Sequence, residues 1–173
     1  MESLQELYRI GFGPSSSHTM APRRAAEQFA RRTPEARAYR VELFGSLAAT
    51  GAGHGTDRAV IAGLGGDSVP VDIIWKPEQE LPRHPNALTL TALDEQGLAA
   101  DSWTAYSTGG GALVGEDDPP GSDHPYPKDT MADILEWCSR EGRQLWEYVV
   151  YHEGADILDY LRDVWKVMKH SIH

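Results

Sequence analysis

The stretch GFGPSSSHTMAP, residues 11–22, joins a glycine–proline turn to three consecutive serines, a histidine and a threonine. Pro14 restricts its own φ angle, and each serine can cap a helix that begins here. The next segment, APRRAAEQFARRT, is rich in good helix formers and repeats alanine and phenylalanine at helical spacing. The sequence therefore predicts a helix over residues 21–33 whose amino-terminal end carries hydroxyl groups and one imidazole.

Two interpretations of this helix start are open. Unpaired backbone N–H groups beside hydroxyls can bind a carboxylate or a phosphate, and His18 could donate a hydrogen bond to that anion or carry a proton near neutral pH. Alternatively, one serine caps the helix, the others face solvent, and a local network satisfies His18. Local chemistry alone favours the second interpretation, because serine caps are common.

Strand and helix patterns alternate through the first two thirds of the chain. Strands are predicted over residues 39–46, 71–75, 86–93 and 98–107, and helices over residues 4–10 and 58–66. DEQG, residues 94–97, predicts the turn between the last two strands. This pattern favours an α/β fold, a sheet with flanking helices.

A second unusual segment is LAATGAGHGTD, residues 47–57, which is predicted to be a glycine-rich turn from a strand into a helix. Glycines there let the backbone approach a ligand closely, and such junctions are the usual ligand crevice of open α/β sheets. His54 would be presented at this junction, while Asp57 could cap the helix or orient an imidazole. No Gly-Lys-Ser/Thr follows, so this is no phosphate-binding P-loop. An ordinary turn with an exposed histidine explains the segment equally well.

A third segment, YSTGGG at residues 106–111, is a strand that runs into three glycines. Ser107 and Thr108 could donate hydrogen bonds to a ligand. A flexible hairpin end is the ordinary explanation, so this segment taken alone is weak evidence for a site.

Composition narrows the functional class. The 173 residues are 40% apolar and 24% charged, with a net charge of −10, as expected of a globular protein without the basic stripe that nucleic-acid binding needs. No apolar run approaches the roughly 20 residues of a membrane span. The one cysteine, Cys138, excludes internal disulfides and suggests a cytoplasmic protein. We therefore expect neither a nucleic-acid nor a membrane partner.

The end of the chain differs in character from the rest. Residues 115–128, GEDDPPGSDHPYPK, have the composition of a linker. After them, TMADILEWCSREG, RQLWEYVVYHEG and DILDYLRDVWKVMKHSIH predict two or three helices with glycine stops. The aromatic residues of this tail suggest an apolar surface that is buried against a partner domain, or against a second copy in a homodimer.

Taken together, the three segments carry a resemblance. SLQELYRIGFGPSSSHTMAPRRAA, LFGSLAATGAGHGTDRAVIAGLGG and YSTGGG, in this order and spacing, resemble the N-terminal (beta) domain of iron–sulfur-dependent bacterial L-serine dehydratases. The resemblance covers most of residues 3–112 and continues through ILEWCSREG and VWKVMKHSI in the tail. The sequence departs from the family pattern at two places. Ala21 stands where that family has glycine, and the segment between Gly66 and Tyr106 is short.

The resemblance implies a fold and a division of the chain. The fold is a mixed α/β (α+β) domain, similar to the allosteric substrate-binding domain of some phosphoglycerate dehydrogenases, followed by a helical tail. We expect a beta-type domain over residues 1–114, a linker over 115–128, and a helical segment over 129–173 that leads to a catalytic (alpha) domain.

The implied reaction converts L-serine to pyruvate and ammonia, although the sequence leaves L-threonine open as a substrate. In that family a four-iron–four-sulfur (4Fe-4S) cluster, held by cysteines of the C-terminal (alpha) domain, acts on the substrate hydroxyl. Cys138 alone cannot hold such a cluster, so no cofactor is expected in this chain. We expect the chain to be inactive alone, with the C-terminal domain or alpha subunit as its partner. It is either an isolated subunit or a shortened single-chain enzyme, and the second alternative is favoured.

The resemblance also implies residue roles. His54 is the expected proton-transfer residue, with His18 as the second catalytic candidate. Asp57 is expected to cap a helix or orient an imidazole beside the substrate. The expected substrate-binding residues are Ser15, Ser16, Ser17, Thr19, Gly53, Asp57, Ser107, Gly109 and Gly110.

Two other functions remain open at this point. The chain could be a non-catalytic module that binds a small anion or amino-acid effector, or that dimerises. A metal site built on His18 and His54 is disfavoured, because no H-x-x-x-H or clustered carboxylate pattern accompanies them.

Overall fold

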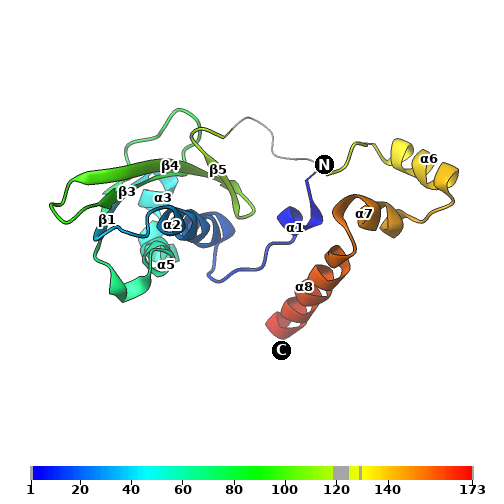
Figure 1. Ribbon diagram of the computed structural model, residues 1–173, viewed down its shortest axis with the longest axis horizontal. Coiled ribbons are helices and arrows are strands. Elements are labelled where there is room, and N and C mark those ends of the chain that lie inside the picture. The colour runs from blue at the N-terminus through cyan, green and yellow to red at the C-terminus, as the bar shows by residue number, and fades with distance from the viewer. Residues whose placement is uncertain (1, 119–124, 129, 173) are drawn as a thin grey trace. The chain divides into compact units, whose positions relative to one another are not determined.

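The computed structural model (Figure 1) describes residues 2–118, 125–128 and 130–172. These residues divide into two compact units. Gly11–Asp118 form the first, called here the α/β unit, and the described residues before Gly11 and after Asp118 form the second, called the helical unit. No described helix is long and apolar enough to cross a membrane. The predicted linker, residues 115–128, lies partly outside the described residues.

The α/β unit is built on one mixed five-stranded sheet. Its strands are β1 (Ala38–Phe44), β2 (Val71–Lys76), β3 (Ala87–Leu93), β4 (Ala99–Gly109) and β5 (Ala112–Gly115). Their order in the sheet is β2-β1-β3-β4-β5; β1 and β2 are parallel and the other pairs are antiparallel. The predicted α/β fold, a sheet with flanking helices and a helical tail, is confirmed.

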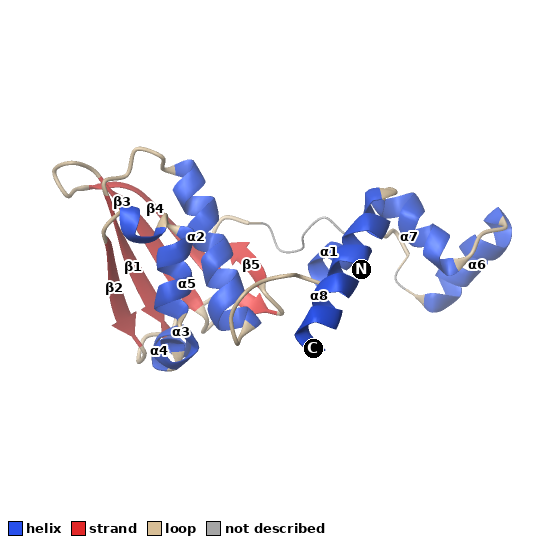
Figure 2. Ribbon diagram, turned by 90° about the horizontal axis from the view of Figure 1, so that it is seen from below, coloured by secondary structure: helices blue, strands red, loops and turns tan. Residues whose placement is uncertain are grey.

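Helices α2 (Ala21–Arg32) and α5 (Thr56–Gly63) lie side by side along one face of this sheet, as Figure 2 shows. The alternation of the strand sequences turns one set of side chains toward these helices. Val41 pairs with Leu90, and Leu43 with Leu88, in adjacent strands, and all four side chains are buried in the core. From α2, Phe29 fills the same core. Each such buried side chain stabilises the fold by about 1.5–3 kcal/mol.

The connection from β1 to the parallel strand β2 is helical. It contains α3 (Gly45–Ala49), α4 (Gly51–His54), α5 and the 3₁₀ turn η2 (Gly66–Ser68). The prediction of a glycine-rich turn over residues 47–57 is therefore wrong. The fully buried Leu47 packs α3 into the core, and tertiary burial of this kind outweighs a local propensity for turns. Within residues 47–57 the backbone takes a positive φ at Gly55, whose value of 72° favours glycine.

The helical unit comprises α1 (Leu4–Leu7), α6 (Met131–Glu141), α7 (Leu145–Glu153) and α8 (Asp156–Ile172). Three donors converge on the carboxylate of Glu153: the Leu4 backbone N–H at 2.8 Å and the hydroxyls of Ser3 and Tyr126. The predicted helices of the tail are confirmed.

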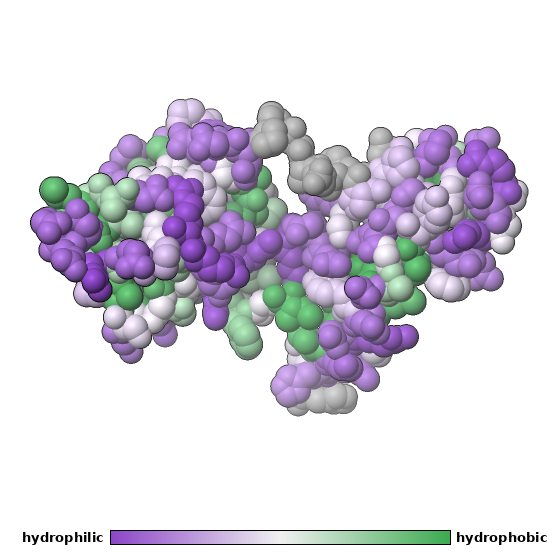
Figure 3. Space-filling view, in the orientation of Figure 1, coloured by the Kyte–Doolittle hydropathy of each residue, from purple (hydrophilic) through white to green (hydrophobic). Residues whose placement is uncertain are grey.

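Hydrophobic side chains remain exposed on the helical unit, and Figure 3 shows such residues gathered in the region of α7 and α8. Exposed examples are Leu145, Trp146, Trp165, Met168 and Ile172. Apolar area of this kind often marks an interaction surface.

Candidate active site

The structure brings His18 and His54 together. His18 lies in η1 (Ser16–Met20), a single π-helical turn that runs directly into α2, and His54 is the last residue of α4. Their ring centroids are 4.8 Å apart, with an angle of 35° between the ring planes. Two segments that are separated in the sequence therefore form one pair of imidazoles in the α/β unit.

His18 is held at both ring nitrogens. Its Nδ1 lies 3.0 Å from the Ser17 hydroxyl, and its Nε2 lies 3.2 Å from the Ser46 carbonyl oxygen. A carbonyl only accepts, so Nε2 donates and Nδ1 accepts from Ser17. Burial lowers the pKa of His18 below its ordinary value; the bond to the Ser46 carbonyl opposes this shift, and the nearby His54 adds to it. The environment thus favours a neutral, fixed imidazole.

His54 is half-buried and held at one nitrogen only. Its Nδ1 lies 2.9 Å from the Thr50 carbonyl oxygen, so Nδ1 carries the hydrogen in the neutral ring. Its Nε2 then has a free lone pair and makes no hydrogen bond with any residue of the described ranges. Of the two rings, His54 is the one able to accept a proton from a ligand.

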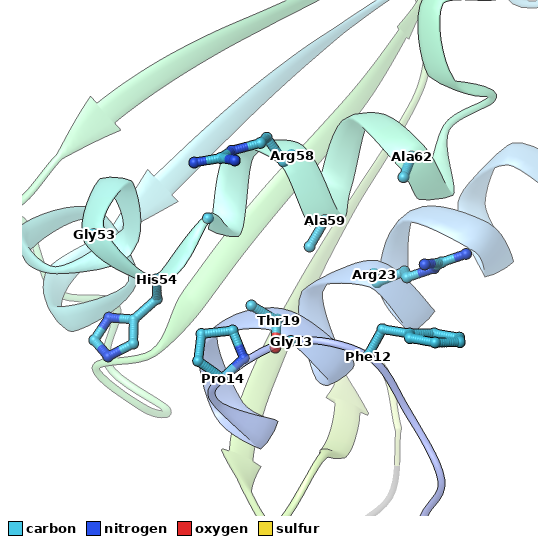
Figure 4. A pocket seen from close by; sticks show the side chains of 11 residues that line it. Phe12, Gly13, Pro14, Thr19, Arg23, Gly53, His54, Arg58, Ala59 and Ala62 are labelled. Atoms are coloured by element: carbon cyan, nitrogen blue, oxygen red, sulfur yellow. The ribbon is translucent and has the colours of Figure 1, made fainter. Parts of the chain in front are cut away.

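His54 lines a cavity of about 400 Å³, called here the groove. Figure 4 shows that the groove runs between the Phe12–Pro14 loop and α5, with His54 and Gly53 near one end. Arg58 and Ala59 of α5 line its other wall. The groove is large enough for a small organic molecule.

The residues of the serine-rich turn, Ser15–Ser17, support the helix start. Of the three serines that the sequence offers as caps, Ser15 is the N-cap, and its hydroxyl accepts from the His18 backbone N–H at 3.3 Å. Ser17 holds the His18 ring, and the buried Thr19 donates its hydroxyl to the Ser15 carbonyl. No side-chain hydrogen bond of Ser16 occurs among the residues that the structure describes.

The remaining predicted residues do not line the groove. Ser107 is fully buried at the end of β4, and its hydroxyl donates to the Ser17 carbonyl at 2.9 Å. Gly109 and Gly110 form the turn into β5 and do not line the groove. Asp57 lies in the first turn of α5, where its Oδ1 is buried without a hydrogen-bond partner in the described part of the chain.

Sequence reasoning missed Ser46 and Arg58. Ser46 holds the His18 ring through its carbonyl and, at 3.2 Å, its hydroxyl. Arg58 lines the groove from the first turn of α5. A cation directly after GHGTD was a signal for Arg58, whereas nothing local indicated Ser46, because its role depends on contact with a distant helix.

An iron–sulfur cluster does not fit these residues. Within residues 2–118, 125–128 and 130–172, no group of three or more His, Cys, Asp or Glu side chains could hold a metal ion. Cys138 is buried in α6 of the helical unit. His18 and His54 each direct one ring nitrogen at a backbone carbonyl, so as a pair they offer a metal few free ligand atoms.

Comparison with known proteins identifies the family of this chain. The model of the serine dehydratase beta chain family matches residues 3–71 and 68–118. The L-serine dehydratase of Streptomyces coelicolor is 34% identical over 96% of this chain and 48% of its own length. L-serine dehydratase 2 of Escherichia coli is 31% identical over 99% of this chain and 48% of its own length. The L-serine dehydratase of Mycobacterium tuberculosis is 38% identical over 80% of this chain and 39% of its own length.

The chain thus spans about half the length of the curated relatives it matches, or less. The matched residues include the serine-rich turn, both histidines and the end of β4. The resemblance seen in the sequence is confirmed, and the chain belongs to the serine dehydratase beta chain family.

Proposed function

We propose that this chain is the N-terminal domain of an L-serine dehydratase, which converts L-serine to pyruvate and ammonia. The observation that carries the proposal is the pairing of His18 and His54, 4.8 Å apart, beside the groove. Membership of the serine dehydratase beta chain family supports it.

In this proposal His54 removes the α-proton of L-serine. Its Nε2 is the free ring nitrogen, and a neutral imidazole with a free lone pair suits general base catalysis. Loss of the α-proton and of the β-hydroxyl leaves an enamine, which tautomerises and hydrolyses to pyruvate and ammonia. His18 is a positioning residue. It stays neutral and fixed between Ser17 and Ser46, and its ring packs against the ring of His54.

The chain contributes only part of the active site in this proposal. A 4Fe-4S cluster would have to be ligated outside it, by cysteines of a C-terminal catalytic domain or alpha subunit, since the described residues offer no suitable ligand group. That partner would also cover exposed hydrophobic residues of α7 and α8, which a homodimer could otherwise bury. The chain alone should then be inactive.

The test is anaerobic pyruvate formation from L-serine by the complete enzyme and, in parallel, by this 173-residue chain. We expect activity in the complete enzyme and none in the chain alone. L-Threonine is assayed in the same way as the alternative substrate. Absence of activity in a complete enzyme whose cluster is intact would reject the proposal and favour a module that binds an amino-acid effector. A chain that is active alone would reject the divided active site.

A further inference from the structure

We infer that Arg58 binds the carboxylate of an α-amino acid in the groove. It thereby makes the groove specific for ligands that carry a carboxylate. The inference rests on the proposed function, because it assigns the substrate's carboxylate to a named side chain. It adds a residue that lies outside the serine-rich turn and the glycine segments.

The first argument is position. Arg58 and His54 both line the groove, and Figure 4 shows the Arg58 side chain extending from α5 toward the end where Gly53 and His54 lie. A Cβ built on Gly55, the residue after His54, would lie only 3.9 Å from the Arg58 Nε. The guanidinium therefore folds back over the turn that presents His54. A carboxylate held there would place the adjoining α-carbon near the imidazole.

The second argument is charge. The side chains that line the groove include Arg23, Arg58 and His54 but no Asp or Glu. The chain as a whole has a net charge of −10, so a cationic groove stands out from its surroundings and attracts anions.

Of the two arginines, Arg58 is the better receptor. The Arg23 Nε donates to Glu27 at 2.9 Å, which balances much of its charge, and Figure 4 shows Arg23 directed away from His54. Arg58 forms no ion pair with any residue in the described ranges. A free guanidinium can bind a carboxylate through two parallel hydrogen bonds, which combine charge with fixed geometry.

The third argument concerns the hydroxyl groups of the helix start, which are the competing donors. The Ser15 hydroxyl accepts from the His18 backbone, the Ser17 hydroxyl bonds to the His18 ring, and the Thr19 hydroxyl donates to the Ser15 carbonyl. These contacts use the hydroxyl hydrogens of Ser17 and Thr19 within the helix start, and the side chains of Ser15, Ser16 and Ser17 do not line the groove. The small side chains of Ala59 and Ala62, and the bare Gly53, leave room in the groove for a compact amino acid.

The direct test is binding of L-serine and of L-serinamide, which lacks the carboxylate, to the 173-residue chain. Chemical shifts of the Gly53 and Gly55 amides report the binding. We expect L-serine to bind about tenfold or more tightly than L-serinamide, Arg58→Gln to remove that preference, and Arg58→Lys to retain part of it. Arg31→Gln is the matched control, because Arg31 is an exposed arginine of α2 outside the groove.

The second test uses the complete enzyme. Arg58→Gln should raise KM for L-serine about tenfold or more with a smaller change in kcat, whereas Arg31→Gln should leave both unchanged. An unchanged KM in Arg58→Gln, or equal binding of L-serine and L-serinamide, would overturn the inference. If the complete enzyme forms no pyruvate but L-serine binding still depends on Arg58, the proposed function fails and the assignment of Arg58 stands.

Discussion

The Nε2 of His18 and the Nδ1 of His54 are both held by backbone carbonyls of one short connection. His18 lies 3.2 Å from the Ser46 carbonyl oxygen, and His54 lies 2.9 Å from that of Thr50. Ser46 belongs to α3, and Thr50 is its C-cap. The segment that follows β1 therefore orients both imidazoles at once, although His18 arrives from a different helix. This shared support helps to set the distance between the rings and leaves Nε2 as the free nitrogen of His54.

Replacing the free imidazole should abolish turnover. In the complete enzyme, we expect His54→Gln to lower kcat for pyruvate formation by about 10²–10⁴-fold, because general base catalysis contributes that much. The absorbance of the proposed iron–sulfur cluster should stay unchanged, since His54 belongs to no group of metal ligands in the described residues.

His170→Gln is the control for this experiment, because His170 is an exposed histidine of α8. Full activity in His54→Gln would remove His54 from the mechanism. Loss of the cluster absorbance would show instead that the variant acts through the structure of the enzyme.

The stability of the α/β unit should depend on pH through His18. Burial lowers the pKa of His18 below 6.5 in the folded state. As pH falls below 6.5, the unfolded chain takes up the proton first, so the free energy of unfolding decreases. Above pH 6.5 the ring is neutral in both states, and its contribution to the free energy of unfolding is fully present. Hydrogen exchange of the β1 and β3 amides at pH 7.5 and 5.5 measures this change in the α/β unit.

His18→Gln should show a smaller loss of protection between the two pH values than the unmodified chain. His152→Gln is the control, because burial also lowers the pKa of His152, which lies in the helical unit. Equal losses in His18→Gln and in the unmodified chain would contradict the assignment of the pH effect to His18.

Local pattern explains what the sequence could predict. The helix over residues 21–33 and the strand around Val41 follow from side-chain periodicity, and the Ser15 cap follows from the preference of serine for helix starts. The prediction failed at α3, because Leu47 is buried in a core that includes Leu88 and Leu90, which lie far away in the sequence. The roles of Ser46 and Arg58 were missed for the same reason, because they depend on how α3 and α5 pack against η1 and the Phe12–Pro14 loop.

Removing the Ser107 hydroxyl should loosen the serine-rich turn. Ser107 is fully buried and donates to the Ser17 carbonyl at 2.9 Å, so Ser107→Ala leaves that carbonyl without this partner. We expect the free energy of unfolding to fall by about 1–3 kcal/mol, as measured by urea denaturation. Turnover in the complete enzyme should fall as well, because Ser17 holds the His18 ring.

Ser102→Ala is the matched control, since Ser102 is an exposed serine of the same strand. Equal stability of the two serine variants would show that the bond from Ser107 contributes little to the fold.

Two glycines beside the groove should respond in opposite ways to alanine. Gly13 has a φ of 111°, and a methyl group there would overlap the buried Thr19 side chain. Gly53 is helical, and a methyl group there would meet no atom within 4 Å. We expect Gly13→Ala to lower the free energy of unfolding by about 1–3 kcal/mol, because alanine is strained at this φ. Gly53→Ala should leave stability unchanged or raise it slightly, because alanine favours helix.

The activity of the same two variants separates stability from binding. Gly53→Ala narrows the groove beside His54, so the complete enzyme should keep its stability while KM for L-serine rises. Urea denaturation and steady-state kinetics of both variants provide the measurements, each serving as the control for the other. A Gly13→Ala variant as stable as the unmodified protein would contradict the strained turn, and an unchanged KM in Gly53→Ala would place the substrate away from that end of the groove.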